Sequence, residues 1–138
     1  MRRLIVLLGL CIIMGGPATA GDGQQRTAIE TVIRAQVAAF RRDDPVAAFG
    51  LASPAIQRQF GDPETFLAMV AQAYRPVYRP RRMVFLETHT DGAGRRVQKV
   101  LVEGPDGDTV TALYPMVLIE GRWRIDGCIL VKTGGERI

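Results

Sequence analysis

The stretch Tyr74–Arg82, YRPVYRPRR, divides the chain into two halves with different hydrophobic periodicity. Pro76 and Pro80 have no amide proton, and each disfavours the helical region for the residue before it, so a helix arriving from the N-terminal side must end here. Apolar residues before this stretch recur with the period of a helix, and those after it alternate with the period of a strand. We therefore expect an α+β domain in which helices precede a sheet.

The helical half begins with its most regular segment, Arg26 to Arg42, whose apolar residues fall on one helical face. Three sequence pairs then combine an N-cap residue with a proline at the first helical position. These pairs predict three short helices, and Gly61 marks the end of the second one. The pairs are Asp44-Pro45, Ser53-Pro54 and Asp62-Pro63.

Three turn signals divide the remaining half into four strands, approximately 82–90, 95–104, 109–119 and 122–132. The signals are Asp91-Gly92-Ala93-Gly94, Asp106-Gly107 and Glu120-Gly121. Loops this short join only antiparallel neighbours, so we expect a curved four-stranded antiparallel meander. Pro115 lies inside the third strand and predicts a bulge there, because it cannot donate a ladder hydrogen bond.

Loop length also predicts the register, and the register sorts the side chains into two faces. A four-residue first loop followed by two two-residue loops pairs Phe85 with Val100, Val100 with Leu113 and Leu113 with Cys128. The core face, expected under the helices, would then carry Val84, Leu86, Val97, Leu101, Val110, Ala112, Tyr114, Met116, Leu118, Trp123, Ile125, Gly127, Ile129 and Val131.

The opposite face of this expected sheet is apolar at its centre. Six apolar side chains there would form a patch whose area is near the largest that a soluble monomer usually exposes. We therefore expect the protein to form a homodimer through this face, where the same residues meet themselves about a twofold axis. The face carries Phe85, Val100, Val102, Leu113, Cys128 and Leu130.

The first twenty residues have the features of a secretory signal peptide. Arg2 and Arg3 precede an apolar run, Leu4 to Met14, and Ala18-Thr19-Ala20 is a typical cleavage sequence. The apolar run is shorter than the ~20 residues that a membrane-spanning helix needs, so no permanent membrane anchor is expected. We expect a signal peptide over residues 1–20, a single mature domain over residues 21–138, and a periplasmic or secreted location.

Composition and charge exclude few functions. The chain of 138 residues is 47% hydrophobic and 23% charged, which fits one globular domain. Loss of Arg2 and Arg3 leaves 18 − 2 = 16 basic residues against 14 acidic ones, a balance too weak to predict nucleic-acid binding. We find no phosphate-binding glycine loop, no metal-ligand spacing and no nucleophile elbow, so neither a cofactor nor a metal is expected.

Two interpretations of individual residues concern catalysis. The expected register brings Glu87, His89 and Asp126 onto one face within two rows, as general acid–base chemistry in a small hydrolase or isomerase would require. Cys128 is the only cysteine of the mature chain. It is either a nucleophilic or redox thiol or, as we favour, a small buried apolar residue.

A third interpretation is ligand binding near the Tyr74–Arg82 stretch. Tyr74, Tyr78, Arg79 and Tyr114 would line the open end of a cone, and Arg79 would hold the anionic group of a small anionic or aromatic ligand. The alternative is that Arg79 binds carbonyl groups at a helix C-terminus while the tyrosines pack.

The order of helices and strands resembles the cystatin-like α+β cone of the nuclear-transport-factor-like superfamily. Five sequence motifs also resemble a bacterial family known only as a domain of unknown function, which implies an exported domain and assigns no catalytic residue. The superfamily includes enzymes, ligand binders and dimeric adaptors. The motifs are Ala52-Ser53-Pro54-Ala55-Ile56-Gln57, Phe60-Gly61, Pro76-Val77-Tyr78-Arg79-Pro80, Ala112-Leu113-Tyr114-Pro115-Met116 and Trp123-Arg124-Ile125-Asp126-Gly127-Cys128.

From these observations we order three possible functions. We expect an exported, non-enzymatic binding module with a small-ligand pocket near the junction of helices and sheet. A dimeric adaptor or structural protein is the second interpretation, and a small hydrolase or isomerase using Glu87, His89 and Asp126 is the third.

Overall fold

The computed structural model describes residues 21–132, and the expected signal peptide, residues 1–20, lies outside this range. In this part of the chain five helices precede five strands, which confirms the α+β prediction. The helices are α1 (Asp22–Arg41), α2 (Pro45–Gly50), α3 (Pro54–Phe60), α4 (Pro63–Ala73) and α5 (Arg75–Tyr78). The strands are β1 (Arg82–Thr90), β2 (Arg96–Glu103), β3 (Thr109–Ile119), β4 (Arg122–Ile125) and β5 (Ile129–Lys132).

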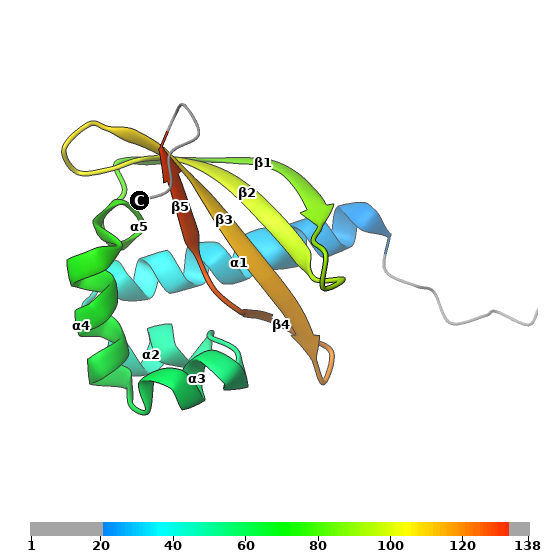
Figure 1. The fold of residues 1–138 in the computed structure, drawn as a ribbon, viewed down its shortest axis with the longest axis horizontal. Coiled ribbons are helices and arrows are strands. Elements are labelled where there is room, and N and C mark those ends of the chain that lie inside the picture. Colours follow the sequence, from blue (N-terminus) through cyan, green and yellow to red (C-terminus); the bar gives the residue numbers. More distant parts are fainter. Residues whose placement is uncertain (1–20, 133–138) are drawn as a thin grey trace, which may run out of the picture.

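The three expected N-caps all form, and they fix the short helices. The side chains of Asp44, Ser53 and Asp62 accept hydrogen bonds from the backbone amides of the third residue after each of them. Gly61 follows α3 with φ of 83°, a conformation that suits glycine at a helix end. Figure 1 shows α2, α3 and α4 grouped near the C-terminal end of the long helix α1, which runs along the curved sheet.

The Tyr74–Arg82 stretch is more helical than the sequence predicted. Helix α4 ends at Ala73 as expected, but Arg75–Tyr78 forms one further helical turn, α5. Pro76 is accepted because it lies in the first turn, where an amide proton has no partner within the helix. The extended chain begins at Arg79, before Pro80.

The sheet follows the expected antiparallel order β1-β2-β3-β4, but its fourth strand is broken in two. Ile125 of β4 pairs with Met116, whereas Ile129 of β5 pairs with Leu113, so one extra residue is present between the two pairs. The extra residue forms a bulge at positions 126–128, opposite Pro115. The backbone amide of Asp126 donates to the Pro115 carbonyl at 2.8 Å, and Gly127 has φ of 154°, which L side chains rarely adopt.

The register between β1 and β2 matches the prediction from Arg82 to Phe85, but a bulge between Phe85 and Thr88 shifts it by one residue toward the turn. Between β2 and β3 the register is shifted by one residue along the whole pair. Phe85 pairs with Val100 as predicted, but Val100 pairs with Ala112 and not with Leu113. The shift between β2 and β3 arises in the loop that joins them, which is five residues long. The Gly104 amide donates to the Asp108 carbonyl at 2.9 Å and ends the ladder there.

Because side chains alternate along a strand, a one-residue shift moves the side chains of β1 and β2 to the opposite face relative to those of β3. Val84 and Leu101, which we expected in the core, are only partly buried, while Val100 and Val102 are fully buried. The bulge before β5 also exchanges the faces of that strand. Leu130, expected on the outer face, is buried, and Ile129, expected in the core, is 44% exposed.

Most of the residues expected to form a homodimer interface therefore belong to the core and not to an exposed surface. Val100 and Leu130 are buried in the core, and Phe85 and Cys128 pack against it. Val102 is buried there as well, so only Leu113, of the six residues in the expected interface, lies outside this cluster. The residues predicted for this face were wrong because the prediction depended on the register between β2 and β3, and homodimer formation itself stays a prediction.

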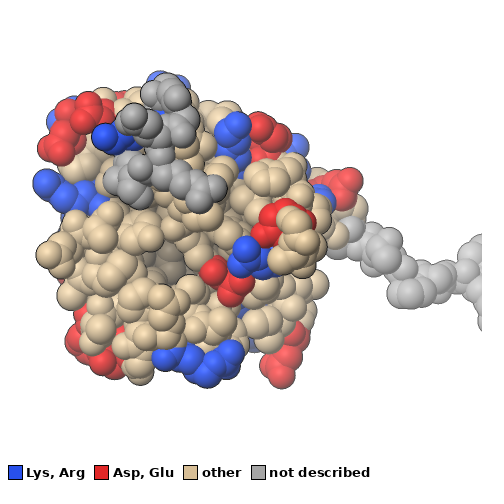
Figure 2. All heavy atoms as spheres, in the orientation of Figure 1, with Lys and Arg blue, Asp and Glu red and all other residues tan. Residues whose placement is uncertain are grey.

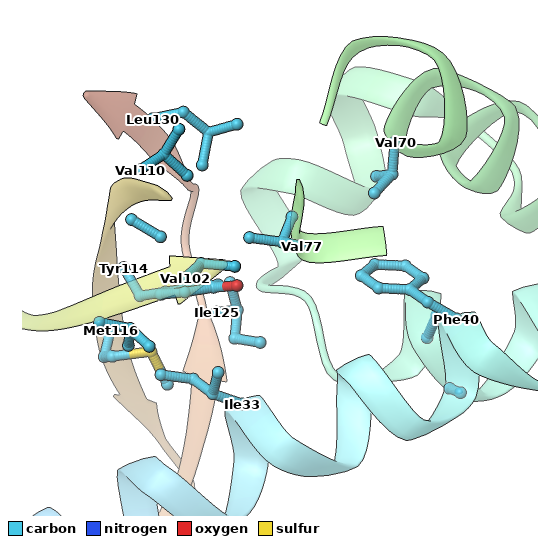
Figure 3. Close-up of a cluster of buried hydrophobic side chains, with 14 of the residues drawn as sticks. Ile33, Phe40, Val70, Val77, Val102, Val110, Tyr114, Met116, Ile125 and Leu130 are labelled. Carbon is cyan, nitrogen blue, oxygen red and sulfur yellow. The ribbon is translucent and has the colours of Figure 1, made fainter. Parts of the chain in front are cut away.

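The core lies between the inner face of the sheet and the helices. Figure 3 shows side chains of the strands pointing toward those of the helices, and burial of each such side chain contributes about 1.5–3 kcal/mol. The residues that meet there include Ile33 and Phe40 of α1, Val70 of α4, Val77 of α5, Val102 of β2, and Tyr114 and Met116 of β3.

The shifted register can be tested with two isosteric substitutions. Val100→Thr places a hydroxyl in the core and should lower the free energy of unfolding by about 1–3 kcal/mol, whereas Val84→Thr should change it by less than about 1 kcal/mol. Both valines lie in strands, so strand propensity cancels. Urea unfolding measures the difference, and a larger loss for Val84→Thr would restore the register predicted from the sequence.

Candidate functional site

A cavity of about 290 Å³ lies between the helices and the C-terminal strands. Figure 2 shows a hollow in this face of the molecule, with acidic and basic side chains at its margin. The cavity is lined by apolar side chains from α1, α3, α4 and α5, by Tyr114 and Pro115 of β3, and by residues 125–129. Aromatic rings dominate the helical wall: Phe40, Phe60, Phe66 and Tyr74.

The bulge between β4 and β5 shapes one side of the cavity. Pro115, Asp126, Gly127 and Cys128 all line it, and they are the residues at which the sheet ladder is interrupted. On the other side Phe66 contacts the rings of Phe40 and Phe60 at centroid distances of 6.1 and 5.6 Å. The cavity thus exists because the broken strand and the aromatic helices do not close against each other.

Asp126 is the best-connected polar residue of the cavity wall. Ser53 Oγ donates to Asp126 Oδ1 at 2.6 Å, and Arg95 Nη1 donates to Asp126 Oδ2 at 2.9 Å. The Asp126 side chain is 16% exposed, so this carboxylate lies at the edge of the solvent. Its two partners come from the helical half and from the loop between β1 and β2.

Arg95 is held by a second carboxylate, that of Asp91. Arg95 Nε and Nη2 both lie 2.9 Å from Asp91 Oδ2, while the backbone amides of Ala93 and Arg95 donate to Asp91 Oδ1. The bond from the Arg95 amide is the main reason that the pKa of Asp91 lies below its usual value. Hydrogen bonds to Asp126 and then to Asp91 raise the pKa of Arg95.

Ser53 joins α3 to the end of β4. Its amide donates to the Ile125 carbonyl at 2.8 Å, and its hydroxyl oxygen accepts from the Ile56 amide at 3.2 Å while donating to Asp126. The residue is 1% exposed. One serine therefore serves as helix cap and as ligand of the Asp126 carboxylate.

Tyr114 and Cys128 form the deep end of the cavity. Their side chains are hydrogen-bonded, and burial raises the pKa of Cys128 to about 12 and that of Tyr114 well above its usual value. Both groups are therefore protonated and uncharged at neutral pH. This state favours the interpretation of Cys128 as a packing residue over that of a nucleophile.

The four residues expected to bind ligand are divided between two places. Tyr74 and Tyr114 line the cavity, whereas Tyr78 and Arg79 are not among its lining residues. Tyr78 donates its hydroxyl hydrogen bond to Asp43, and Arg79 donates to Asp43 and to the Phe40 carbonyl.

Tyr78 and Arg79 hold the C-terminal end of α1. The Arg79 guanidinium also lies 4.2 Å from the centre of the Tyr78 ring. The contact with the Phe40 carbonyl is the one that the alternative interpretation of Arg79 required. Asp43, the shared partner, has φ of 51° directly after the helix.

The three residues expected in an acid–base site are not brought together. Glu87 and His89 lie on β1, and Asp126 follows β4, while β1 and β4 are at opposite ends of the order β1-β2-β3-β4. Glu87 instead pairs with Lys99 at 3.3 Å, and His89 is exposed. Asp126 alone of the three lines the cavity.

Sequence comparison gives a family for this fold and site. Residues 22–138 match the family model described as Domain of unknown function (DUF4864). The chain belongs to this family. No curated protein matches the chain. The match confirms the resemblance to a family without an assigned function, so the chemistry of the site has to be argued from the residues themselves.

The part of the chain that the structure describes contains neither a metal-binding cluster nor a membrane-spanning helix. No group of three or more His, Cys, Asp or Glu side chains within residues 21–132 is placed to hold a metal ion. Across the same described range, no helix has both the length and the hydropathy needed to cross a membrane.

Sequence reasoning missed Arg95 and the second role of Ser53. Ser53 was identified only as a helix cap, and Arg95 only as the residue after a turn. The turn sequence itself held one usable signal, since an Asp followed by Gly-Ala-Gly commonly accepts backbone hydrogen bonds of its own loop.

The raised pKa of Cys128 predicts that its thiol reacts slowly with alkylating reagents. With a pKa of about 12 against an ordinary 9.0, its reaction with iodoacetamide at pH 8 should be about 1000-fold slower than in urea-unfolded protein, because the thiolate reacts. The unfolded thiol loses its proton first, so stability should fall as pH rises from 9 toward 12, and less steeply in Cys128→Ala. Equal reaction rates of Cys128 with iodoacetamide in native and in unfolded protein would contradict the raised pKa.

Proposed function

We propose that the protein is an exported, non-enzymatic binding module that takes a small, largely apolar ligand into the cavity at Tyr114. The observation that carries this proposal is the cavity itself. Its volume of about 290 Å³ is near the lower end of the ~300–1,000 Å³ range of small-molecule sites. Such sites typically combine an apolar lining with a few polar groups, and here Arg95 and Asp126 are the charged groups of the lining.

The lining favours an aromatic ligand over a simple anion. Phe40, Phe60, Phe66 and Tyr74 offer ring faces and edges to a planar guest. The expected anion-binding residue, Arg79, is engaged with Asp43 and lies away from the lining. The separation of Glu87 and His89 from Asp126 supports binding without acid–base catalysis.

Export and fold type belong to the same proposal. The signal-like residues 1–20 support a periplasmic or secreted location. Helices followed by a curved antiparallel sheet around a cavity support the cystatin-like cone of the nuclear-transport-factor-like superfamily. In that fold the space between helices and sheet would be the ligand site.

A neutral fluorescent probe, N-phenyl-1-naphthylamine, tests the proposal. Its fluorescence should rise saturably with the native protein, and Ile56→Trp, which narrows the cavity, should weaken binding about tenfold or more. Ile56 lines the cavity in the first turn of α3.

Val46→Trp is the matched control for this test. Val46 lies in the first turn of α2 but is 67% exposed and away from the cavity. Its substitution should leave probe binding unchanged. Equal binding by both tryptophan variants, or no binding by the native protein, would contradict the proposed site.

A further inference from the structure

The charged end of the cavity carries one more negative than positive charge. Arg95 lies between Asp91 and Asp126 and bonds to both, so two carboxylates surround one guanidinium. Arg95 and Asp126 are the charged residues among those that line the cavity. A charged ligand group would therefore enter a site of net charge −1.

Three of the five N–H donors of Arg95 are directed at carboxylates. Nε and Nη2 lie near Asp91 Oδ2, and Nη1 donates to Asp126 Oδ2. A ligand carboxylate that reached one of the other two donors would lie next to the carboxylates of Asp91 and Asp126. The resulting repulsion is strong because one side of the site is apolar and screens charge poorly.

Asp126 itself has unused capacity to accept hydrogen bonds. Oδ1 accepts one bond, from Ser53, and Oδ2 accepts one, from Arg95. A carboxylate has about four lone-pair positions, so each oxygen can accept another donor. A ligand N–H or O–H group that reaches Asp126 thus gains a charge-assisted hydrogen bond.

The other polar groups of the lining do not offset the preference for a hydrogen-bond donor or a positive charge at Asp126. Gln36 donates its side-chain amide to the Ala48 carbonyl at 3.1 Å, and Tyr114 and Cys128 bond to each other and stay uncharged. Because Asp126 is 16% exposed, a cationic group beside it keeps part of its hydration. The desolvation cost that a charge would meet at the deep end is avoided there.

We propose that the cavity selects ligands with an aromatic or alicyclic body and a cationic amine, whose ammonium group donates to Asp126 at the cavity mouth. This inference rests on the proposed function and adds the chemical class of the ligand. The body lies among the rings of α1, α3 and α4. The amine replaces water as an additional partner of the carboxylate.

Three ligands of nearly equal size test the selection: 2-phenylethylamine, 2-phenylethanol and phenylacetate. Isothermal titration of the full domain should give the amine a Kd about tenfold or more below that of the alcohol, with phenylacetate weakest, because only the amine gains a charged hydrogen bond. Displacement of N-phenyl-1-naphthylamine places each ligand in the same cavity.

Two variants then assign the preference to the charges at the mouth. Asp126→Asn removes the net negative charge and should bring the amine within about threefold of the alcohol, while alcohol binding changes little. Arg95→Gln removes the positive charge and should widen the preference for the amine. Asp106→Asn, an exposed change in the turn between β2 and β3, is the matched control and should alter none of the affinities.

The outcomes separate the two claims. If the alcohol binds and displaces the probe but the amine is no tighter than phenylacetate, the ligand class is wrong and the binding function stands. If no member of the series binds and the probe does not bind either, both are wrong. Should Asp126→Asn fail to fold, the native affinity order and the wider preference of Arg95→Gln decide the question.

Discussion

The carboxylate of Asp126 is the point on which the arrangement of the cavity depends. It accepts a hydrogen bond from Ser53, 73 residues earlier in the chain, and another from Arg95, 31 residues earlier. The helical half and the first hairpin are thereby fixed to the same side chain. A carboxylate that is mostly shielded from water needs such partners, because an unpaired one would cost several kcal/mol.

This constraint also explains why a cavity survives beside a well-packed core. The bulge that places Asp126 at the wall comes from Pro115 and Gly127, which interrupt the ladder between β3 and the C-terminal strands. Ser53 fixes the start of α3 to the end of β4 and holds the aromatic helices at a distance from the bulge. The same few hydrogen bonds thus contribute to stability and to the shape of the cavity.

The features that could be predicted from sequence are those set by neighbouring residues. The caps at Asp44, Ser53 and Asp62 and the pairing of Phe85 with Val100 followed from local patterns and were confirmed. The register beyond Val100 failed because Gly104 and Asp108 close a longer loop than the Asp106-Gly107 turn indicated. Two of the expected ligand residues, Tyr74 and Tyr114, line the cavity, but the network around Asp126 joins segments too distant in sequence for spacing to reveal.

A double-mutant cycle on Ser53 and Asp126 tests the central claim most directly. Urea unfolding of Ser53→Ala, Asp126→Ala and the double variant isolates their interaction from the separate loss of the helix cap. We expect a coupling free energy of about 1.5 kcal/mol, as for a hydrogen bond to a charged group. A coupling that is zero within error would contradict the claim that this contact joins the helices to the sheet.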